Sequence, residues 1–100
     1  MKITFLGTGT SMGVPVIACP CAVCRSGAAH DHRLRTSVYV ETDEGHCLLI
    51  DIGPDFRMQM LTHGLTRVDA ILVTHAHRDH VAGIDDVRPI NYAQQGAIPL

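Results

Sequence analysis

The stretch Thr74-His75-Ala76-His77-Arg78-Asp79-His80 places three histidines and an aspartate within six residues. Residues two apart in an extended segment point to the same side, so His75 and His77 can offer imidazole nitrogens to one ion. If the chain then turns into a helix, Asp79 and His80 project toward a second position. Imidazole and carboxylate ligands together suit Zn, Mn or Fe better than Ca or Mg. The spacing predicts a pair of divalent metal ions, whose characteristic chemistry is hydrolysis.

Chance clustering in a polar loop is the alternative interpretation of this stretch. Its position argues against that, because residues 68–74, Val-Asp-Ala-Ile-Leu-Val-Thr, form a largely apolar run of strand length immediately before His75. Such runs are typical of buried central strands. Open α/β sheets usually bind ligands beyond the C-terminal ends of their strands, so we expect residues 75–80 to line a site.

A second cluster, Cys19-Pro20-Cys21-Ala22-Val23-Cys24, has the spacing C-x-C-x-x-C. Three thiolates this close can bind one Zn ion at about 2.3 Å, and such a site would cross-link a long loop. His30 or His32 completes the tetrahedron only if the loop folds back. Buried or redox-labile thiols are the alternative, and an iron–sulfur cluster is disfavoured because a fourth Cys at matching spacing is absent. Cys47 lies in an expected strand and is interpreted as a core residue.

Composition limits the classes of protein to consider. The 100 residues are 46% hydrophobic and 18% charged with a net charge of -2, which is ordinary for one globular domain. The slightly negative net charge gives no electrostatic basis for binding nucleic acid or an anionic membrane. No apolar run approaches the roughly 20 residues that span a bilayer, and no secretory signal is recognisable at Met1. We expect a cytoplasmic protein with reduced thiols.

Alternation and turn residues predict a mixed α/β chain. The first strand is expected at 2–6, and a long cysteine-containing loop at 11–35. Strands at 37–42 and 46–52 are expected to pair as a hairpin around Asp43-Glu44-Gly45. A helix of about ten residues should follow Pro54 and end at Gly64. The remaining expected elements are a central strand at 68–74, a short helix at 81–87, then a loop and a strand at 98–100.

The pattern His75-x-His77-x-Asp79-His80, followed by Gly83, resembles the signature of the metallo-β-lactamase fold superfamily. Three further stretches agree with this resemblance. Residues 5–9, Phe-Leu-Gly-Thr-Gly, resemble the opening of the phosphodiesterase and tRNase Z branch, and residues 49–53 resemble the superfamily's Asp-x-Gly strand end. Residues 53–57 and 83–89 resemble a bacterial subgroup close to the phosphoribosyl cyclic phosphate phosphodiesterases. The fold implied is the α/β class, an αββα sandwich of which this chain supplies roughly the N-terminal half.

The resemblance also implies roles for individual residues. His75 and His77 would bind one metal ion and Asp79 and His80 the other, with Asp79 also orienting the attacking hydroxide as the catalytic residue. Asp51 would either support the site from beneath or cap the helix that begins near Asp55. The cysteine loop resembles the structural zinc loop of the phosphoribosyl cyclic phosphodiesterases, in which a later His completes the site. Arg35 and Arg88 are candidates for binding a substrate phosphate, with surface or ion-pair roles as the alternative.

In the family, each metal takes a further His, and an Asp bridges the two ions. None of these residues matches a position within 1–100 of this sequence. The chain is therefore expected to be the N-terminal part of a single domain from a longer protein. With two protein ligands per ion, residues 1–100 alone are expected to be inactive.

The expected function is hydrolysis of a small or cyclic phosphodiester by a hydroxide bound to two Zn or Mn ions, with one further structural Zn. A tRNA 3′-processing endonuclease and a thioester hydrolase of the same fold are alternatives, because fold does not settle substrate. An alternative of another class is a non-catalytic zinc-binding module. The expected partner is a small-molecule phosphodiester, neither membrane nor nucleic acid is expected, and a homodimer is left open.

Overall fold

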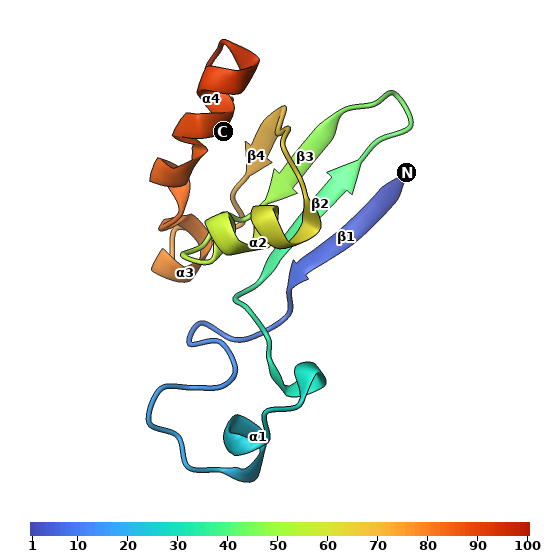
Figure 1. The fold of residues 1–100 in the computed structure, drawn as a ribbon. Coiled ribbons are helices and arrows are strands. Elements are labelled where there is room, and N and C mark those ends of the chain that lie inside the picture. Colours follow the sequence, from blue (N-terminus) through green and yellow to red (C-terminus); the bar gives the residue numbers. More distant parts are fainter.

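The computed structural model describes residues 1–100 and contains one four-stranded sheet in the order β1-β2-β3-β4 (Figure 1). The first three strands are antiparallel neighbours, and β4 runs parallel to β3. The parallel pair requires a crossover, which the α2 helix provides. The strands are β1 Lys2–Gly7, β2 Ser37–Glu41, β3 Cys47–Ile50 and β4 Ala70–Leu72.

The predicted hairpin is confirmed. β2 and β3 pair from Val38 opposite Ile50 to Glu41 opposite Cys47. The turn between them closes with a hydrogen bond from the Thr42 amide to the His46 carbonyl, and Gly45 adopts a φ of 89°. That left-handed conformation is open to glycine at little cost, so Gly45 belongs where the chain reverses.

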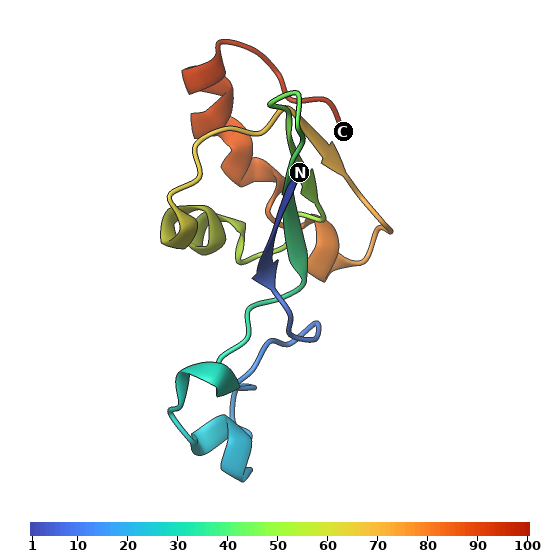
Figure 2. The same cartoon turned by 90° about the vertical axis from the view of Figure 1, so that its right-hand side faces the viewer.

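The helices are short. α2 spans Phe56–His63 and ends, as predicted, at Gly64 with a left-handed φ of 64°. α2 and α4 lie on the same side of the sheet (Figure 2). The other helical segments are α1 Ala22–Arg25, η1 Ala29–Asp31, α3 Arg78–Val81, η2 Ile84–Val87 and α4 Arg88–Gln94. None of these helices has the length and the apolar composition that a membrane span requires.

The hydrophobic core lies between the sheet and these helices. One cross-strand row, Tyr39–Leu49–Ile71, faces the core, and all three side chains are buried. Phe56 and Met60 of α2 pack into the same cluster. Alternation along a strand therefore sends every second side chain toward the helices.

The opposite face of the sheet is apolar but much less covered. Its side chains belong to two cross-strand rows, Phe5–Val38–Ile50–Leu72 and Ile3–Val40–Leu48–Ala70. Phe5 is 67% exposed and Leu72 51% exposed. A contiguous apolar sheet face is typical of a layer that packs against another layer, which agrees with the expected sandwich.

Three predictions about the last third of the chain are wrong. The run 68–74 contains only the short strand β4, which lies at the edge of the sheet and not at its centre. Gln94 bonds both backbone groups of Val68, so Val68 does not pair with β3. Beyond β4, the Ile71 amide bonds only to the Pro99 carbonyl, and residues 98–100 form no strand. Instead of a loop, α4 begins at Arg88, since Pro89 suits the first turn of a helix.

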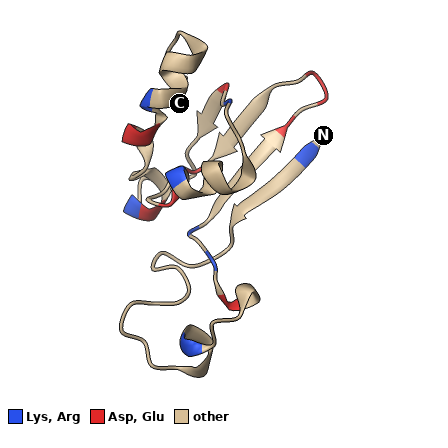
Figure 3. Ribbon diagram, in the orientation of Figure 1, with Lys and Arg blue, Asp and Glu red and all other residues tan.

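The predicted helix at 81–87 is divided into α3 and η2, which Gly83 separates. The predicted loop at 11–35 forms an arm that projects beyond the sheet and contains α1 and η1 (Figure 1). Paired hydrogen bonds between Val14 and Arg33 close its base. Basic and acidic positions are interspersed along the whole chain (Figure 3).

Asp69 ties the start of β4 to β3, and its loss should destabilise the fold. Its carboxylate accepts a 2.7 Å hydrogen bond from the Cys47 amide, which with the Arg67 guanidinium lowers the Asp69 pKa. Asp69→Ala should lower the unfolding free energy by about 1–3 kcal/mol at neutral pH. Because the folded pKa lies below the unfolded value of about 3.9, this stabilisation holds above that value and is lost as pH falls through the folded pKa.

Urea unfolding at neutral pH and near pH 3 measures this dependence. Asp86→Ala is the matched control, because Asp86 is exposed and makes no side-chain bond. An Asp69→Ala deficit that is equal at both pH values, or no deficit at all, would contradict the assignment.

Candidate metal centre

The histidine-rich segment lies where the parallel strands β3 and β4 end together. Ile50 pairs with Leu72, and the next amide, that of Asp51, bonds to the Leu72 carbonyl at 2.8 Å. The chain after β4 then runs through residues 74–77 and enters α3 at Arg78. This is the C-terminal edge of a parallel pair, the usual place for a ligand site in α/β sheets.

The structure brings the three histidine rings of the motif together. The ring centroids of His75 and His77 are 4.5 Å apart, and those of His75 and His80 are 4.0 Å apart. His77 is extended, with φ −62° and ψ 144°, and α3 begins at the next residue. The turn from extended chain to helix therefore places His75 beside both His77 and His80, although no three ligand atoms of the motif converge as closely as the sulfurs of Cys19, Cys21 and Cys24 do.

Asp51 lies beneath this cluster and is 3% exposed. Its carboxylate accepts hydrogen bonds from the Thr74 amide at 2.8 Å, the Thr74 hydroxyl at 2.7 Å and His80 Nδ1 at 2.7 Å. Burial alone raises the pKa of Asp51, but these hydrogen bonds outweigh it and hold the pKa below its usual range. Asp51 does not cap α2, since Asp55 occupies the N-cap position and bonds to Arg35.

The Asp51 carboxylate also determines which ring nitrogens are free. An ionised carboxylate only accepts, so the Thr74 hydroxyl and His80 Nδ1 must donate to it. Having donated its proton, the Thr74 oxygen accepts from His75 Nδ1 at 2.9 Å. In both His75 and His80 the Nε2 lone pair is then left available for an ion.

The contact between His80 and Asp79 indicates whether these two side chains could bind a metal ion. His80 Nε2 lies 3.0 Å from Asp79 Oδ2. With Nδ1 protonated, Nε2 carries a lone pair, so two acceptors face each other and require a proton or a cation between them. Imidazole nitrogen beside carboxylate oxygen is a donor set that suits Zn or Mn. The residues present therefore fit a divalent ion.

Close backbone packing fixes α3 over the strand end. A Cβ on Gly53 would lie 2.2 Å from the Asp79 carbonyl oxygen, and one on Gly83 would lie 2.1 Å from the Gly53 carbonyl oxygen. The Ile52 amide bonds to the His80 carbonyl, and the Gly83 amide bonds to the Ile52 carbonyl. Glycine at 53 and 83 therefore allows the backbone of α3, which bears part of the motif, to pack directly against the chain that follows β3.

A family profile described as "Beta-lactamase superfamily domain" matches residues 46–100, which include the whole histidine motif. The chain belongs to this superfamily. This match confirms the resemblance drawn from the sequence. The metallo-β-lactamase fold is also confirmed, and this chain contributes a mixed sheet and its helices to that fold.

Three relatives illustrate the relationship. A protein named "Octanoyltransferase" from Porphyromonas gingivalis is 50% identical over 98% of this chain, which spans 20% of that protein. The crystal structure of a new diphosphatase from the PhnP family is 54% identical, with a TM-score of 0.91, over 98% of this chain and 39% of that one. Zn²⁺-bound PqqB from Methylobacterium extorquens is 30% identical, with a TM-score of 0.77, over 88% and 36%. The chain thus spans well under half the length of these relatives.

A pocket of about 390 Å³ adjoins the motif, and none of its five lining residues is hydrophobic. Arg35 reaches it, held by a 2.9 Å ion pair with Asp55 and a 3.1 Å bond to the Ser11 carbonyl. Arg88, the other arginine considered from the sequence, bonds to the Asp85 carbonyl on η2 and lines none of the pockets described. Sequence reasoning missed Arg78, although it stands inside the motif itself.

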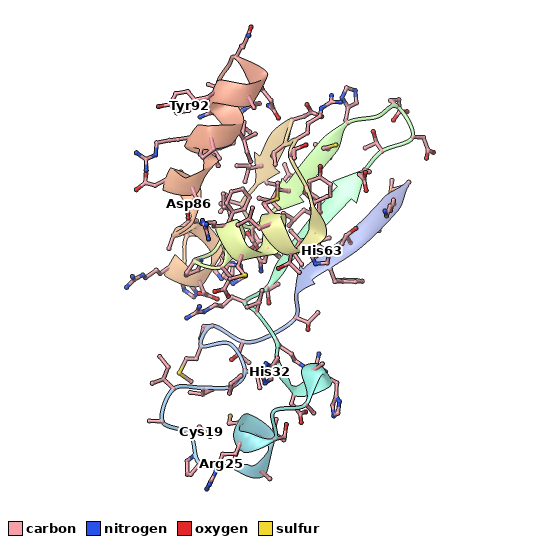
Figure 4. All side chains as sticks on the ribbon, viewed as in Figure 1. Cys19, Arg25, His32, His63, Asp86 and Tyr92 are labelled. Carbon is pink, nitrogen blue, oxygen red and sulfur yellow. The ribbon has the colours of Figure 1, made fainter.

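The three clustered cysteines converge as their spacing predicts. Their sulfur atoms all lie within 4.8 Å of one another, and no histidine joins the group. Figure 4 shows Cys19 in the arm beside α1, with His32 nearer the sheet. The Cys24 amide lowers the pKa of Cys21, whereas Cys19 and burial outweigh the Val16 amide and raise that of Cys24. Thiols this close resist joint ionisation unless a cation is present, so the cluster could hold a metal.

Asp51→Asn should weaken metal binding, because an amide cannot hold His80 and Thr74 as the carboxylate does. We expect the affinity for Zn at the histidine motif to fall about 10–100-fold. Competition against a chromophoric chelator, with the protein starting metal-free, measures this. Asp69→Asn, at the opposite end of β4, is the control, and an unchanged affinity in Asp51→Asn would refute the supporting role.

Gly83→Ala should displace α3, because the added Cβ collides with the Gly53 carbonyl oxygen and also lies 3.0 Å from the Phe56 Cβ. We expect a loss of about 1–3 kcal/mol in unfolding free energy, together with weaker metal binding. Gly96→Ala is the matched control, since its Cβ would meet nothing within 4 Å. Equal stability of the two variants in urea would show that the contact is dispensable.

Proposed function

We propose that this protein is a metal-dependent hydrolase of a small phosphodiester, cyclic ones included. The single observation that carries the proposal is the chain of contacts from Asp51 through His80 Nδ1 to the free His80 Nε2 beside Asp79. In this arrangement one imidazole nitrogen and one carboxylate oxygen lie side by side and would hold a cation between them. The description of one relative as a diphosphatase favours a phosphorus centre.

Each residue of the motif would have a specific role. His75 and His77 would hold one ion, and Asp79 and His80 a second, with the remaining ligands supplied from outside residues 1–100. When bound, such ions supply Lewis acidity and lower the pKa of coordinated water. Asp79, which lines the pocket, would orient the attacking water and accept its proton. Residues 1–100 alone, with two ligands per ion, would not turn over substrate.

The pocket favours a phosphoryl substrate over a thioester. Its lining includes Arg35 and Arg78, and none of its five lining residues is a hydrophobic one that would hold an acyl chain. Arg35 is already oriented by Asp55 and the Ser11 carbonyl, so it can present a remaining edge to phosphate oxygens. A long nucleic acid is disfavoured, because basic and acidic residues are mixed along the chain (Figure 3).

The cysteine cluster would hold a structural zinc ion. Three sulfur atoms within 4.8 Å supply three of the four ligands that such sites use, and a fourth would come from another segment. A non-catalytic zinc module, in which this cluster is the only metal site, is the competing interpretation. It makes the histidine motif dispensable, which an experiment can test.

His77→Ala should abolish metal-dependent turnover, because it removes a direct ligand. We expect the rate on bis(p-nitrophenyl) phosphate and on cyclic phosphates to fall by more than about 100-fold in the full-length protein loaded with Mn or Zn. His63→Ala, an exposed histidine at the end of α2, is the matched control.

Two outcomes would overturn the proposal. Full activity of His77→Ala would place the chemistry elsewhere. Turnover of thioesters or of precursor tRNA, with none on small phosphodiesters, would assign the protein to another branch of the superfamily.

A further inference from the structure

The three sulfur atoms in the arm are close enough to react with one another as well as to bind a metal. They belong to Cys19, Cys21 and Cys24, lie within 4.8 Å of one another, and form no disulfide. Two sulfur atoms bond at about 2.05 Å, so a small movement of the loop would join two of them. The reduced cluster can therefore bind a metal, and the oxidised cluster can form a disulfide instead.

Cys21 and Cys24 are the pair best placed to form that disulfide. The Cys24 amide donates to Cys21 Sγ at 3.5 Å, which brings both residues into one turn at the start of α1. Their spacing, C-x-x-C, is typical of redox-active thiol pairs. Cys21 is exposed, whereas Cys24 is partly buried and its sulfur accepts from the Val16 amide. An oxidant in solution would therefore reach Cys21 first, and Cys24 would react with the product.

The arm that contains the cluster has little else to hold it together. It projects beyond the sheet, and no residue of α1 or η1 is buried within this chain (Figure 1). Paired backbone hydrogen bonds between Val14 and Arg33 close its base, below the cluster. Where a segment lacks a core, the free energy of metal binding contributes directly to its folding. Loss of the metal would therefore loosen the arm between Val14 and Arg33.

We propose that the cysteine cluster is a peroxide-sensitive modification site, in which oxidation of Cys21 and Cys24 to a disulfide releases the metal and loosens the arm. The inference rests on the structural zinc ion of the proposed function and not on the hydrolytic activity. Oxidation would remove two of the three sulfur ligands and leave only Cys19. Reduction of the disulfide would restore the site.

The oxidation proceeds in two steps. The Cys21 thiolate attacks one oxygen of hydrogen peroxide, so that an S–O bond forms, the O–O bond breaks, and the departing hydroxide takes up a proton to become water. The Cys24 thiolate then attacks the sulfur of the Cys21 sulfenic acid. An S–S bond forms, the S–O bond breaks, and a second water molecule leaves. Two electrons thus pass from the two sulfur atoms to the peroxide.

Zinc release from the full-length protein measures the effect. Hydrogen peroxide should release one zinc ion per chain to a chromophoric chelator, beyond the amount released without peroxide. The nitrogen and oxygen ligands of the histidine motif do not form disulfides, so its ions should stay bound. The affinity of the oxidised cluster for zinc should be more than about 100-fold lower, and dithiothreitol should restore it. Cys47→Ala, which alters the cysteine in β3, is the matched control and should release zinc as the unsubstituted protein does.

Peptide mapping locates the disulfide. Trypsin should leave all three clustered cysteines in one peptide, residues 3–25, and should leave Cys47 in another, residues 36–57. After peroxide treatment, two thiols of the first peptide should resist alkylation, and fragmentation should join Cys21 to Cys24. Cys47 should remain open to alkylation in the denatured protein.

Cys24→Ser provides a second test that does not require the metal. Without its partner, the oxidised Cys21 should persist as a sulfenic acid and react with dimedone. A cluster that binds zinc and retains it in peroxide, or a disulfide that involves Cys47, would overturn the inference and leave the proposed zinc site in place. If the cluster binds no zinc, the proposed zinc site fails, and this inference fails with it.

Discussion

The buried carboxylate of Asp51 is the constraint on which the site depends. It occupies a left-handed backbone conformation with φ 63°, directly after β3, and accepts three hydrogen bonds from Thr74 and His80. A non-glycine residue adopts this conformation at a cost that the surrounding contacts must offset. Here they do so by joining the end of β3 to the loop after β4 and to α3. One carboxylate thereby sets the path of the backbone and the tautomers of two histidines.

The sequence predicted the parts of the fold that local chemistry determines. The hairpin around Gly45 and the end of α2 at Gly64 both follow from residues that favour a left-handed turn. A strand was correctly predicted where β4 lies but was wrongly expected at the centre of the sheet, because an apolar run indicates burial and not which strands lie beside it. The length of β4 was set by Gln94, which bonds to Val68 from α4, and no local pattern reveals a partner 26 residues away.

For the site, too, the sequence predicted what local geometry determines and missed what depends on the fold. Spacing was enough to predict that His75, His77 and His80 gather, since the geometry of an extended segment and a helix is local. The role of Asp51 was left open, because its hydrogen bonds to Thr74 and His80 exist only after β4 pairs with β3. Arg35 and Arg78 line one pocket for the same non-local reason, because they belong to segments that lie far apart in the sequence.

The central claim is that residues 75–80 hold metal ions, and anomalous X-ray scattering from zinc-soaked crystals of the full-length protein tests it most directly. We predict one peak about 2.0–2.2 Å from ring nitrogens of His75 and His77 and a second at that distance from His80 Nε2 and an Asp79 carboxylate oxygen, besides one among Cys19, Cys21 and Cys24. A single peak at the cysteines, with none at the histidines, would contradict the account and identify the chain as part of a non-catalytic zinc-binding protein.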